Sequence, residues 1–251
     1  MSLVTHGAEK NEREQLQLYV VFNNVPYKKG LTTSWGFACL VKGPDKTLLF
    51  DTGGEGEILL SNMEQLGLEP AEVNAVVLSH IDADHTGGLS AFLERNSDVT
   101  VFMPASFPAA FQQMVKRHGA KIDTVAGPQP LFEHVHSTGE MGEAIREQAL
   151  ILATSRGLVV MTGCAHPDVA DMTERASEYL GNKITLLMGG FHLGGRSESA
   201  IRVIIRRLHA LGVGQIAPSH CTGETAIEMF REAWGENYIE GGLGAHITLP
   251  K

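Results

Sequence analysis

Four apolar segments of this chain each end in a short turn that contains a histidine together with glycine or serine. In chain order, these turns read LSHIDADH, TGCAHPD, GGFHLGG and PSHCTG. In α/β proteins the loops that follow strands carry functional side chains, because rigid strands aim the side chains and the loops leave them accessible. The recurrence therefore predicts that several strands deliver histidines to a functional site.

The segments around these turns alternate between a strand-like and a helix-like hydrophobic pattern, which is typical of an α/β fold. Strands are predicted at residues 16–23, 34–43, 46–53, 75–80, 99–104, 149–155, 158–166, 184–193 and 215–223. Helices are predicted near 59–66, after the glycine pair at 87–88, at 109–119, 171–181 and 198–211, and close to the C-terminus. Because no low-complexity run or long linker interrupts the chain, residues 1–251 are expected to form one compact domain of two similar layers.

The stretch 105–145 separates the two halves of this pattern and contains Gly127, Pro128 and Pro130. Loops of this length are often functional, so one interpretation is a lid over the site. A plain connecting helix followed by a turn is the other interpretation, and the sequence does not decide between them.

Charge and composition narrow the range of partners. The net charge of −9 and the pI near 5.6 leave no broad cationic surface for nucleic acid or anionic lipid, so both are disfavoured as partners. The N-terminal stretch is charged where a signal peptide needs its apolar segment, and no apolar run approaches ~18 residues. We therefore expect a soluble, cytoplasmic protein with a small-molecule substrate, and its three cysteines are expected to be reduced thiols.

The stretch LSHIDADHTGGL concentrates four side chains that can bind metal. In an extended turn, His80 and Asp82 project to the same side and can share one ion, whereas Asp84 and His85 begin the next helix and can turn toward a second ion. Two neighbouring ions form a clamp suited to displacement reactions. The glycine pair at 87–88 lets the backbone approach this corner closely.

Four residues supply only half of the ligands that two ions require. The other histidine-bearing strand ends offer His166 and His220 as the remaining ligands. Eleven histidines in 251 residues will sometimes fall in turns by chance. Four at strand ends, one of them inside H-x-D-x-D-H, favour a metal site over that explanation.

With these residues in hand, the chain resembles the metallo-β-lactamase superfamily over nearly its whole length. The family signature H-x-H-x-D-H is matched by His80, Asp84 and His85, with Asp82 at the position of the second histidine. LLFDTG is similar to the family's opening motif, whose aspartate, here Asp51, supports the metal centre from behind its ligands. The resemblance implies a four-layered αββα sandwich with a dinuclear site at one edge, between the two sheets.

The chain most resembles a subgroup of predicted metal-dependent hydrolases that includes archaeal dihydropteroate synthase-like enzymes, which form a pterin-aminobenzene-phosphate. The segments STGEM, TGCAHPD, GGFHL and HCTG carry this resemblance. It implies two divalent metal ions, with zinc the usual element, and a phosphorylated or pterin-like small substrate. Because Asp82 replaces a histidine, it makes the ligand set harder, so iron or manganese stays open beside zinc.

Several residues keep two interpretations. Cys164 occupies the position of the family's bridging aspartate and is either a thiolate ligand or a small buried thiol that packs a strand end. His192, on a glycine-rich loop, is expected to be catalytic or substrate-binding rather than a ligand. Glu147 either steadies the site or is a solvated charge, and His136 is expected to be a loop histidine without a role.

The leading hypothesis is a dinuclear metal-dependent hydrolase that uses a metal-bound hydroxide. In one group His80, Asp82 and His166 hold an ion; in the other, Asp84, His85 and His220 do, with Asp84 also counted as catalytic. Condensation at a pterin, a non-haem di-iron redox centre with a separate electron donor, a metal-containing ligand sensor and a nuclease stay open as alternatives. The oligomeric state is not predicted.

Overall fold

Two β-sheets face each other in the computed structural model, which describes residues 15–43 and 46–250. The first sheet has seven strands in the order β13-β1-β2-β3-β4-β5-β6, and the second has six in the order β12-β11-β10-β9-β8-β7. The strands of the first sheet are β1 (Gln15–Asn23), β2 (Phe37–Lys42), β3 (Thr47–Phe50), β4 (Ala75–Val77), β5 (Thr100–Pro104), β6 (Lys121–Val125) and β13 (His246–Pro250). Those of the second are β7 (Gln129–Phe132), β8 (Val135–Ser137), β9 (Leu150–Thr154), β10 (Gly157–Thr162), β11 (Ile184–Gly190) and β12 (Gln215–Ser219).

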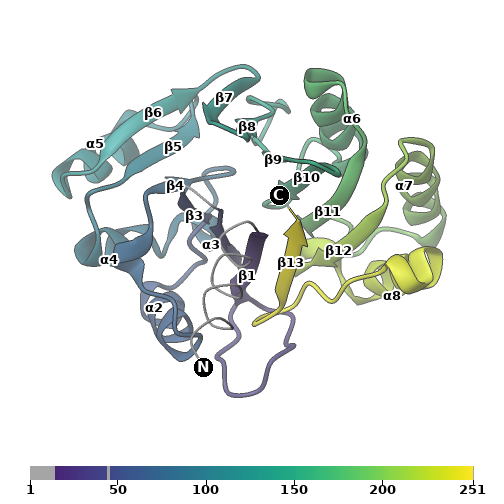
Figure 1. Cartoon of the computed structure of the whole chain (residues 1–251), viewed down its shortest axis with the longest axis horizontal. Coiled ribbons are helices and arrows are strands. Elements are labelled where there is room, and N and C mark those ends of the chain that lie inside the picture. Colours follow the sequence, from purple (N-terminus) through teal and green to yellow (C-terminus); the bar gives the residue numbers. More distant parts are fainter. Residues whose placement is uncertain (1–14, 44–45, 251) are drawn as a thin grey trace, which may run out of the picture.

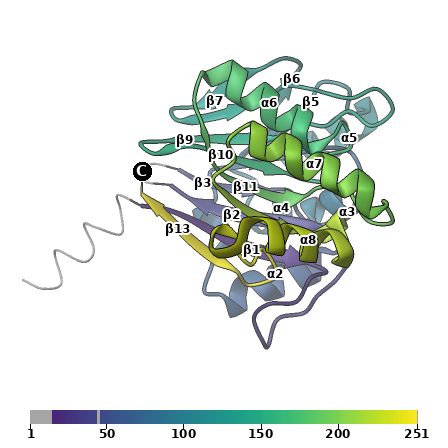
Figure 2. The ribbon, with the colours of Figure 1, turned by 90° about the vertical axis from the view of Figure 1, so that its right-hand side faces the viewer.

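Helices cover the outer face of each sheet, which completes four layers (Figures 1 and 2). On the first sheet lie α2 (Gly56–Gln65), α4 (Leu89–Arg95) and α5 (Ala109–Arg117), with the short α3 (Ala83–Thr86) at its edge. On the second lie α6 (Val169–Leu180), α7 (Glu198–Ala210) and α8 (Glu224–Trp234). Three single-turn 3₁₀ helices complete the description: η1 (Pro70–Glu72), η2 (His220–Thr222) and η3 (Gly235–Asn237).

Three apolar clusters hold these layers together, and strand alternation assigns residues to them. In β1, Leu16, Leu18 and Val20 point between the sheets, while Val21 points to the helices of the first layer. A register shift between Val20 and Phe22 then keeps Phe22 on the helix side as well. A third cluster joins the second sheet to α6, α7 and α8. The αββα sandwich expected from the sequence is therefore confirmed.

The direction of the strands determines where the polar turns meet. Strands β3, β4, β5 and β6 run parallel to one another, as do β10, β11 and β12. Parallel strands end at the same edge of their sheet, so the turns that follow β3 and β4 face the turns that follow β10, β11 and β12. All of the turns singled out in the sequence lie at this edge.

Most predicted strands and helices are found within two or three residues of their expected bounds, but residues 105–145 correct the expectation. This stretch forms neither a lid nor a helix followed by a turn. After α5 it contributes β6 to the edge of the first sheet and then β7 and β8 to the edge of the second. β6 reads KIDTV and is mostly exposed, so its sequence lacks the apolar run that identifies central strands. The final strand β13 was also not predicted.

Two further expectations concern the membrane. Across residues 15–43 and 46–250, no helix combines the length and the apolar character needed to cross a bilayer. The charged N-terminal stretch that argues against a signal peptide lies outside the described residues.

The segment between β1 and β2 is fixed to α2 by one buried asparagine. The Asn62 side chain accepts a hydrogen bond from Thr32 N and donates to the carbonyl oxygens of Val21 and Thr32. This segment carries Trp35, which lies near the candidate site described below. Asn62 thus links the packing of a helix to the position of a loop at the site.

We expect Asn62→Ala to lower the free energy of unfolding by about 1–3 kcal/mol, because it removes three hydrogen bonds, one of them to the carbonyl of the buried Val21. Urea titration followed by circular dichroism measures the change. Glu64→Ala, on the exposed face of the same helix, is the matched control and should change stability by less than about 0.5 kcal/mol. Equal stabilities for the two variants would contradict the proposed role of Asn62 in fixing the β1–β2 segment to α2.

Candidate metal centre

The turn after β4 and the short helix α3 place four predicted ligands side by side. The Asp82 carbonyl accepts hydrogen bonds from the backbone N–H groups of His85 and Thr86, which begins the helix at this point. The glycines at 87–88 pack on the turn after β3, where a Cβ on either would lie 2.3 Å or less from a backbone oxygen. The close backbone approach expected of this pair is confirmed.

The first group of candidate ligands combines this turn with the turn after β10. The Oδ2 atom of Asp82 lies 3.5 Å from His80 Nε2 and 3.7 Å from His166 Nε2. The two imidazole rings meet edge to face, with centroids 4.6 Å apart. The sequence assigned these three residues to one ion, and the structure brings them together.

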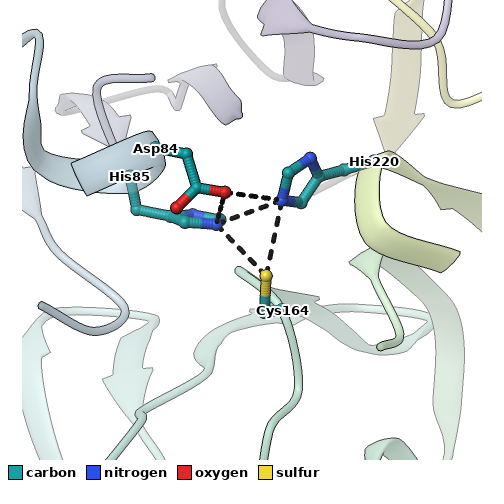
Figure 3. A group of neighbouring side chains, drawn as sticks. All are labelled: Asp84, His85, Cys164 and His220. Carbon is teal, nitrogen blue, oxygen red and sulfur yellow. Dashed lines mark hydrogen bonds and ion pairs between the residues drawn. The ribbon is translucent and has the colours of Figure 1, made fainter. Parts of the chain in front are cut away.

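The second group combines the same turn with the turn after β12. His85 Nε2 and His220 Nε2 are 3.2 Å apart, and Asp84 Oδ2 lies 3.6 Å from the first and 3.3 Å from the second (Figure 3). Burial alone would raise the pKa of Asp84, but its hydrogen bond with His220 and the charge of His85 hold it well below its usual value. These three residues are also those assigned to one ion from the sequence.

Each of the four histidines uses its Nδ1 atom for a hydrogen bond inside the protein. His85 Nδ1 donates to Asp51 Oδ2 over 2.8 Å. His166 Nδ1 donates to Glu147 Oε2 over 3.0 Å, and His220 Nδ1 donates to Asn24 Oδ1 over 2.7 Å. The donor role follows because a carboxylate or an amide oxygen can only accept.

His80 follows the same rule through a serine. The Ser79 hydroxyl donates its only hydrogen to Asp51 Oδ2 over 2.7 Å, so its 2.8 Å contact with His80 Nδ1 must be donated by the ring. His80 Nε2 is buried and has no hydrogen-bond partner. Burial alone would lower the pKa of His80, but Asp82, Glu147 and Asp51 raise it to about 9, so these surroundings favour positive charge at the ring.

The arrangement matches the chemistry of a metal centre. With every Nδ1 engaged, the Nε2 lone pairs of four imidazoles converge on one another and on two carboxylates. Tetrahedral zinc with bonds of 2.0–2.3 Å requires ligand atoms about 3.3–3.6 Å apart, and the second group has separations of 3.2, 3.3 and 3.6 Å. Histidine ligands usually donate their other nitrogen to a carboxylate or a carbonyl, as His85, His166 and His220 do, whereas His80 donates to the Ser79 hydroxyl.

Asp51 supports both groups from behind. It is fully buried and accepts hydrogen bonds from Ser79 N, Ser79 Oγ and His85 Nδ1. Gly163 passes so close that a Cβ there would lie 2.1 Å from Ser79 Oγ and 2.9 Å from Asp51 Oδ2. A single carboxylate therefore orients one histidine directly and, through Ser79, a second one.

Glu147 does the same for the turn after β10. Its carboxylate is fully buried and accepts hydrogen bonds from the backbone N–H groups of Cys164, Ala165 and His166, as well as from the His166 ring. Burial opposes ionisation, but His166, His80 and these N–H groups lower the pKa of Glu147 to about 2. The alternative of a solvated charge is therefore wrong.

Left-handed backbone conformations, which are rare in residues other than glycine, gather around this site. In the described residues they occur at Asp51, His134, Ala165, Asp168, His192 and His220. All except His134 lie in the turns at the site edge. Such strain persists only where the surrounding structure enforces it, and it is typical of functional sites.

Two more predicted residues, Cys164 and His192, lie beside the two groups, together with Cys221, which the sequence analysis did not single out as a site residue. Ligand atoms of Cys164, His192 and Cys221 all lie within 4.8 Å of one another. The His192 ring is 4.4 Å from that of His166 and partly exposed, and its hydrogen bond with Cys221 raises its pKa. His136 lies elsewhere, in β8, against the ring of Tyr179. The role of His192 stays a prediction.

Sequence reasoning missed four residues at the site: Ser79, Asn24, Trp35 and Cys221, the last of which directly follows His220. Ser79 directly precedes His80, so a hydroxyl beside a candidate ligand was the available signal. Asn24 and Trp35 carry no such signal, because they reach His220 from a loop 196 and 185 positions earlier in the chain, respectively. The Trp35 ring lies 5.0 Å from the His220 ring.

Comparisons with known proteins bear on this site and this fold. The sequence model of the metallo-beta-lactamase superfamily matches residues 36–167, more than half of the chain. A 7,8-dihydropterin-6-methyl-4-(beta-D-ribofuranosyl)-aminobenzene-5'-phosphate synthase of Methanocaldococcus jannaschii is 27% identical over 241 residues, which covers 78% of this chain and 82% of that protein.

Solved structures show the same fold. Tm1679, a metal-dependent hydrolase of the beta-lactamase superfamily, has a TM-score of 0.80 at 23% identity over 94% of this chain and 100% of that one. The short form of human tRNase Z has a TM-score of 0.66 at 12% identity, again over 94% of this chain and 100% of that one. At these identities, the likeness concerns the fold alone.

We expect Asp51→Asn to weaken zinc binding by roughly 10–100-fold, because the amide places N–H groups where His85 and Ser79 now donate. Asparagine tolerates the left-handed backbone of this position, so the fold should be retained. Competition with a chromophoric chelator measures the affinity. Asp98→Asn, at an exposed position, is the control. Unchanged affinity in a folded Asp51 variant would exclude this supporting role.

Proposed function

Because the chain belongs to the metallo-beta-lactamase superfamily, we propose that it is a metal-dependent hydrolase with two divalent ions. One ion is assigned to His80, Asp82 and His166, and the other to Asp84, His85 and His220. The observation that carries this proposal is the set of four imidazoles whose Nδ1 atoms are all engaged and whose Nε2 atoms converge. Buried lone pairs arranged in this way repel one another unless a cation lies among them.

Two divalent ions, when bound, supply Lewis acidity and bring the pKa of bound water close to neutrality. The protein's own contribution is orientation. Asp51 and Glu147 prevent the ligand rings from turning, and both are fully buried. His192 lies at the exposed rim, where its ring N–H can donate a hydrogen bond to a substrate oxygen.

Cavities on two sides of the centre indicate where a substrate lies. His166, His192 and Arg196 line one cavity, together with apolar residues at the start of α6 and α7. Trp35, His220 and Tyr238 line the other. Each cavity therefore includes one candidate metal ligand, so a substrate in either cavity would reach the centre.

The side chains of these cavities favour a substrate that is aromatic at one end and anionic at the other. The Trp35 side chain is an exposed flat surface for an aromatic ring. Arg196 makes no ion pair with any of the residues described and can therefore meet an anionic group of the substrate. The synthase of Methanocaldococcus jannaschii acts in the chemistry of a phosphorylated dihydropterin, as its name states. By analogy, we propose a small phosphorylated, pterin-like substrate for this chain.

A second candidate is bond formation rather than hydrolysis. It is favoured by the name of the same relative, which is a synthase rather than a hydrolase. The same orienting residues would serve a condensation, because they position groups and do not themselves react. A panel of phosphodiesters, phosphomonoesters, thioesters and lactones tests hydrolysis, and dihydropterin with an aminobenzene derivative tests condensation.

We expect protein purified without chelator or added metal to hold about two equivalents of metal per chain by elemental analysis. His80→Ala/His85→Ala should lose both, because each replaced ring belongs to a different group. The control variant His118→Ala/His209→Ala removes two histidines away from the site and should keep both equivalents. An Asp82→His variant should bind a larger share of zinc, because an imidazole replaces a hard carboxylate ligand.

The outcome of that measurement separates the alternatives. Zinc or manganese supports hydrolysis or condensation, whereas iron with visible absorption supports the di-iron redox alternative. A wild-type chain that binds no transition metal, even after refolding with several, would refute the proposed function.

We expect Trp35→Ala to raise KM for the aromatic substrate bis(p-nitrophenyl) phosphate by roughly tenfold, since stacking on an aromatic side chain is worth about 1–3 kcal/mol. kcat should change less, because the Trp35 side chain supplies no ligand atom to either group. Tyr27→Ala removes another exposed aromatic side chain of the same loop that lines neither cavity. Equal effects of the two variants would argue against stacking on Trp35.

A further inference from the structure

We propose that Cys164 is a thiolate ligand shared by both metal ions. This inference rests on the dinuclear centre proposed above and assigns its only sulfur ligand. Loss of the thiol proton to solvent would accompany metal binding, and one metal–sulfur bond would form to each ion.

The position of the sulfur atom is the main argument. Cys164 Sγ lies 3.3 Å from His85 Nε2 and 3.4 Å from His220 Nε2, which makes it the fourth corner of the second group (Figure 3). With Asp84 Oδ2, five of the six separations among the four atoms are 3.2–3.6 Å. Cys164 and Asp84 complete the set, with ligand atoms within 4.8 Å of each other. Tetrahedral zinc with nitrogen, oxygen and sulfur ligands requires about 3.3–3.6 Å.

The same sulfur atom also belongs to the first group. Ligand atoms of His80, Cys164 and His166 all lie within 4.8 Å of one another. Cys164 is therefore the one residue common to both groups. Its neighbour His80 Nε2 is fully buried without a hydrogen-bond partner, which independently indicates that a cation belongs on this side of the sulfur atom.

A packing role explains these contacts less well. Cys39 shows what a packing thiol looks like in this chain, because it is part of the apolar cluster between the sheets. Cys164 belongs to none of the three apolar clusters, although it is buried. A neutral thiol has one hydrogen, so it could satisfy only one of the two Nε2 atoms that it contacts.

The backbone around Cys164 is built to aim the side chain. Glu147 accepts hydrogen bonds from the N–H groups of residues 164–166, and Ala165 adopts a left-handed conformation with φ of 59°. This places Cys164 and His166 on the same side of the turn, facing the histidines of the first sheet. A thiol that merely filled space would not need a buried carboxylate to fix its main chain.

A shared thiolate changes which element the centre prefers. Asp82 alone makes the ligand set harder and keeps manganese open, but thiolate is a soft ligand that favours zinc or iron over manganese. With sulfur in contact with both ions, the soft donor reaches each of them. Of zinc, iron and manganese, manganese is therefore the element that this ligand set favours least.

Cobalt substitution tests the proposal directly, because cobalt bound to thiolate has a sulfur-to-metal charge-transfer band in the near ultraviolet. We expect wild-type protein with two equivalents of cobalt to show this band, and Cys164→Ser to lack it. Zinc affinity at both subsites should fall by more than roughly 100-fold in Cys164→Ser, since even residues behind the ligands are worth about 10–100-fold. Cys164→Asp, which restores a bridging group, should retain two equivalents without the band.

Two matched controls replace the other cysteines. Cys39 is buried in the core between the sheets, and Cys221 lies beside Cys164 and His192. Each is replaced by serine. Both should keep the band, and circular dichroism reports whether each variant is folded. Persistence of the band in Cys164→Ser, its loss in Cys221→Ser, or weakened binding at one subsite alone would overturn the shared ligand. Two cobalt equivalents without any band would also overturn it and leave the dinuclear centre intact, whereas absence of bound metal would refute the centre itself.

Discussion

The close approach of four imidazole rings, three of them buried and that of His166 largely so, is the constraint on which the rest of the site depends. Each ring donates its Nδ1 hydrogen to an internal acceptor, so in the neutral ring the Nε2 atom faces the other rings with a lone pair. Two buried carboxylates enforce this state in three of the rings, Asp51 on one sheet and Glu147 on the other, and the Asn24 amide does so for His220. With their Nδ1 atoms held in this way, the four rings present converging Nε2 atoms, which a bound cation would satisfy.

The two-sheet architecture explains how such a costly arrangement is sustained. Parallel strands from both sheets end at one edge, so the first sheet brings four of the six candidate ligands and the second brings two, and the apolar cluster between the sheets fixes the distance across them. Left-handed residues in these turns store strain that the surrounding packing must offset. The rigidity of the sandwich is therefore what permits strained turns to meet at one site.

The superfamily resemblance drawn from the motifs is confirmed, and so are most elements of the fold. Local spacing carried that information: H-x-D-x-D-H determines which side chains share a turn, and β-branched runs identify central strands. Edge strands such as β6 were not predicted, because a half-exposed strand needs no apolar run in its sequence. Asn24 and Trp35 were not predicted as site residues. They lie 196 and 185 positions before His220, and their proximity to it arises from tertiary packing, which no local pattern encodes. The ligand roles themselves stay predictions.

The separation of His85 and His220 along the chain has a consequence for the unfolded state. These residues are 135 positions apart in sequence, yet their Nε2 atoms nearly touch. An ion held by both closes a very long loop, in the manner of a covalent crosslink, and loop-closure entropy makes such links effective in disfavouring extended conformations. If the proposed centre binds metal, the concentration of that metal would therefore affect the fraction of the chain that is folded as well as its chemistry.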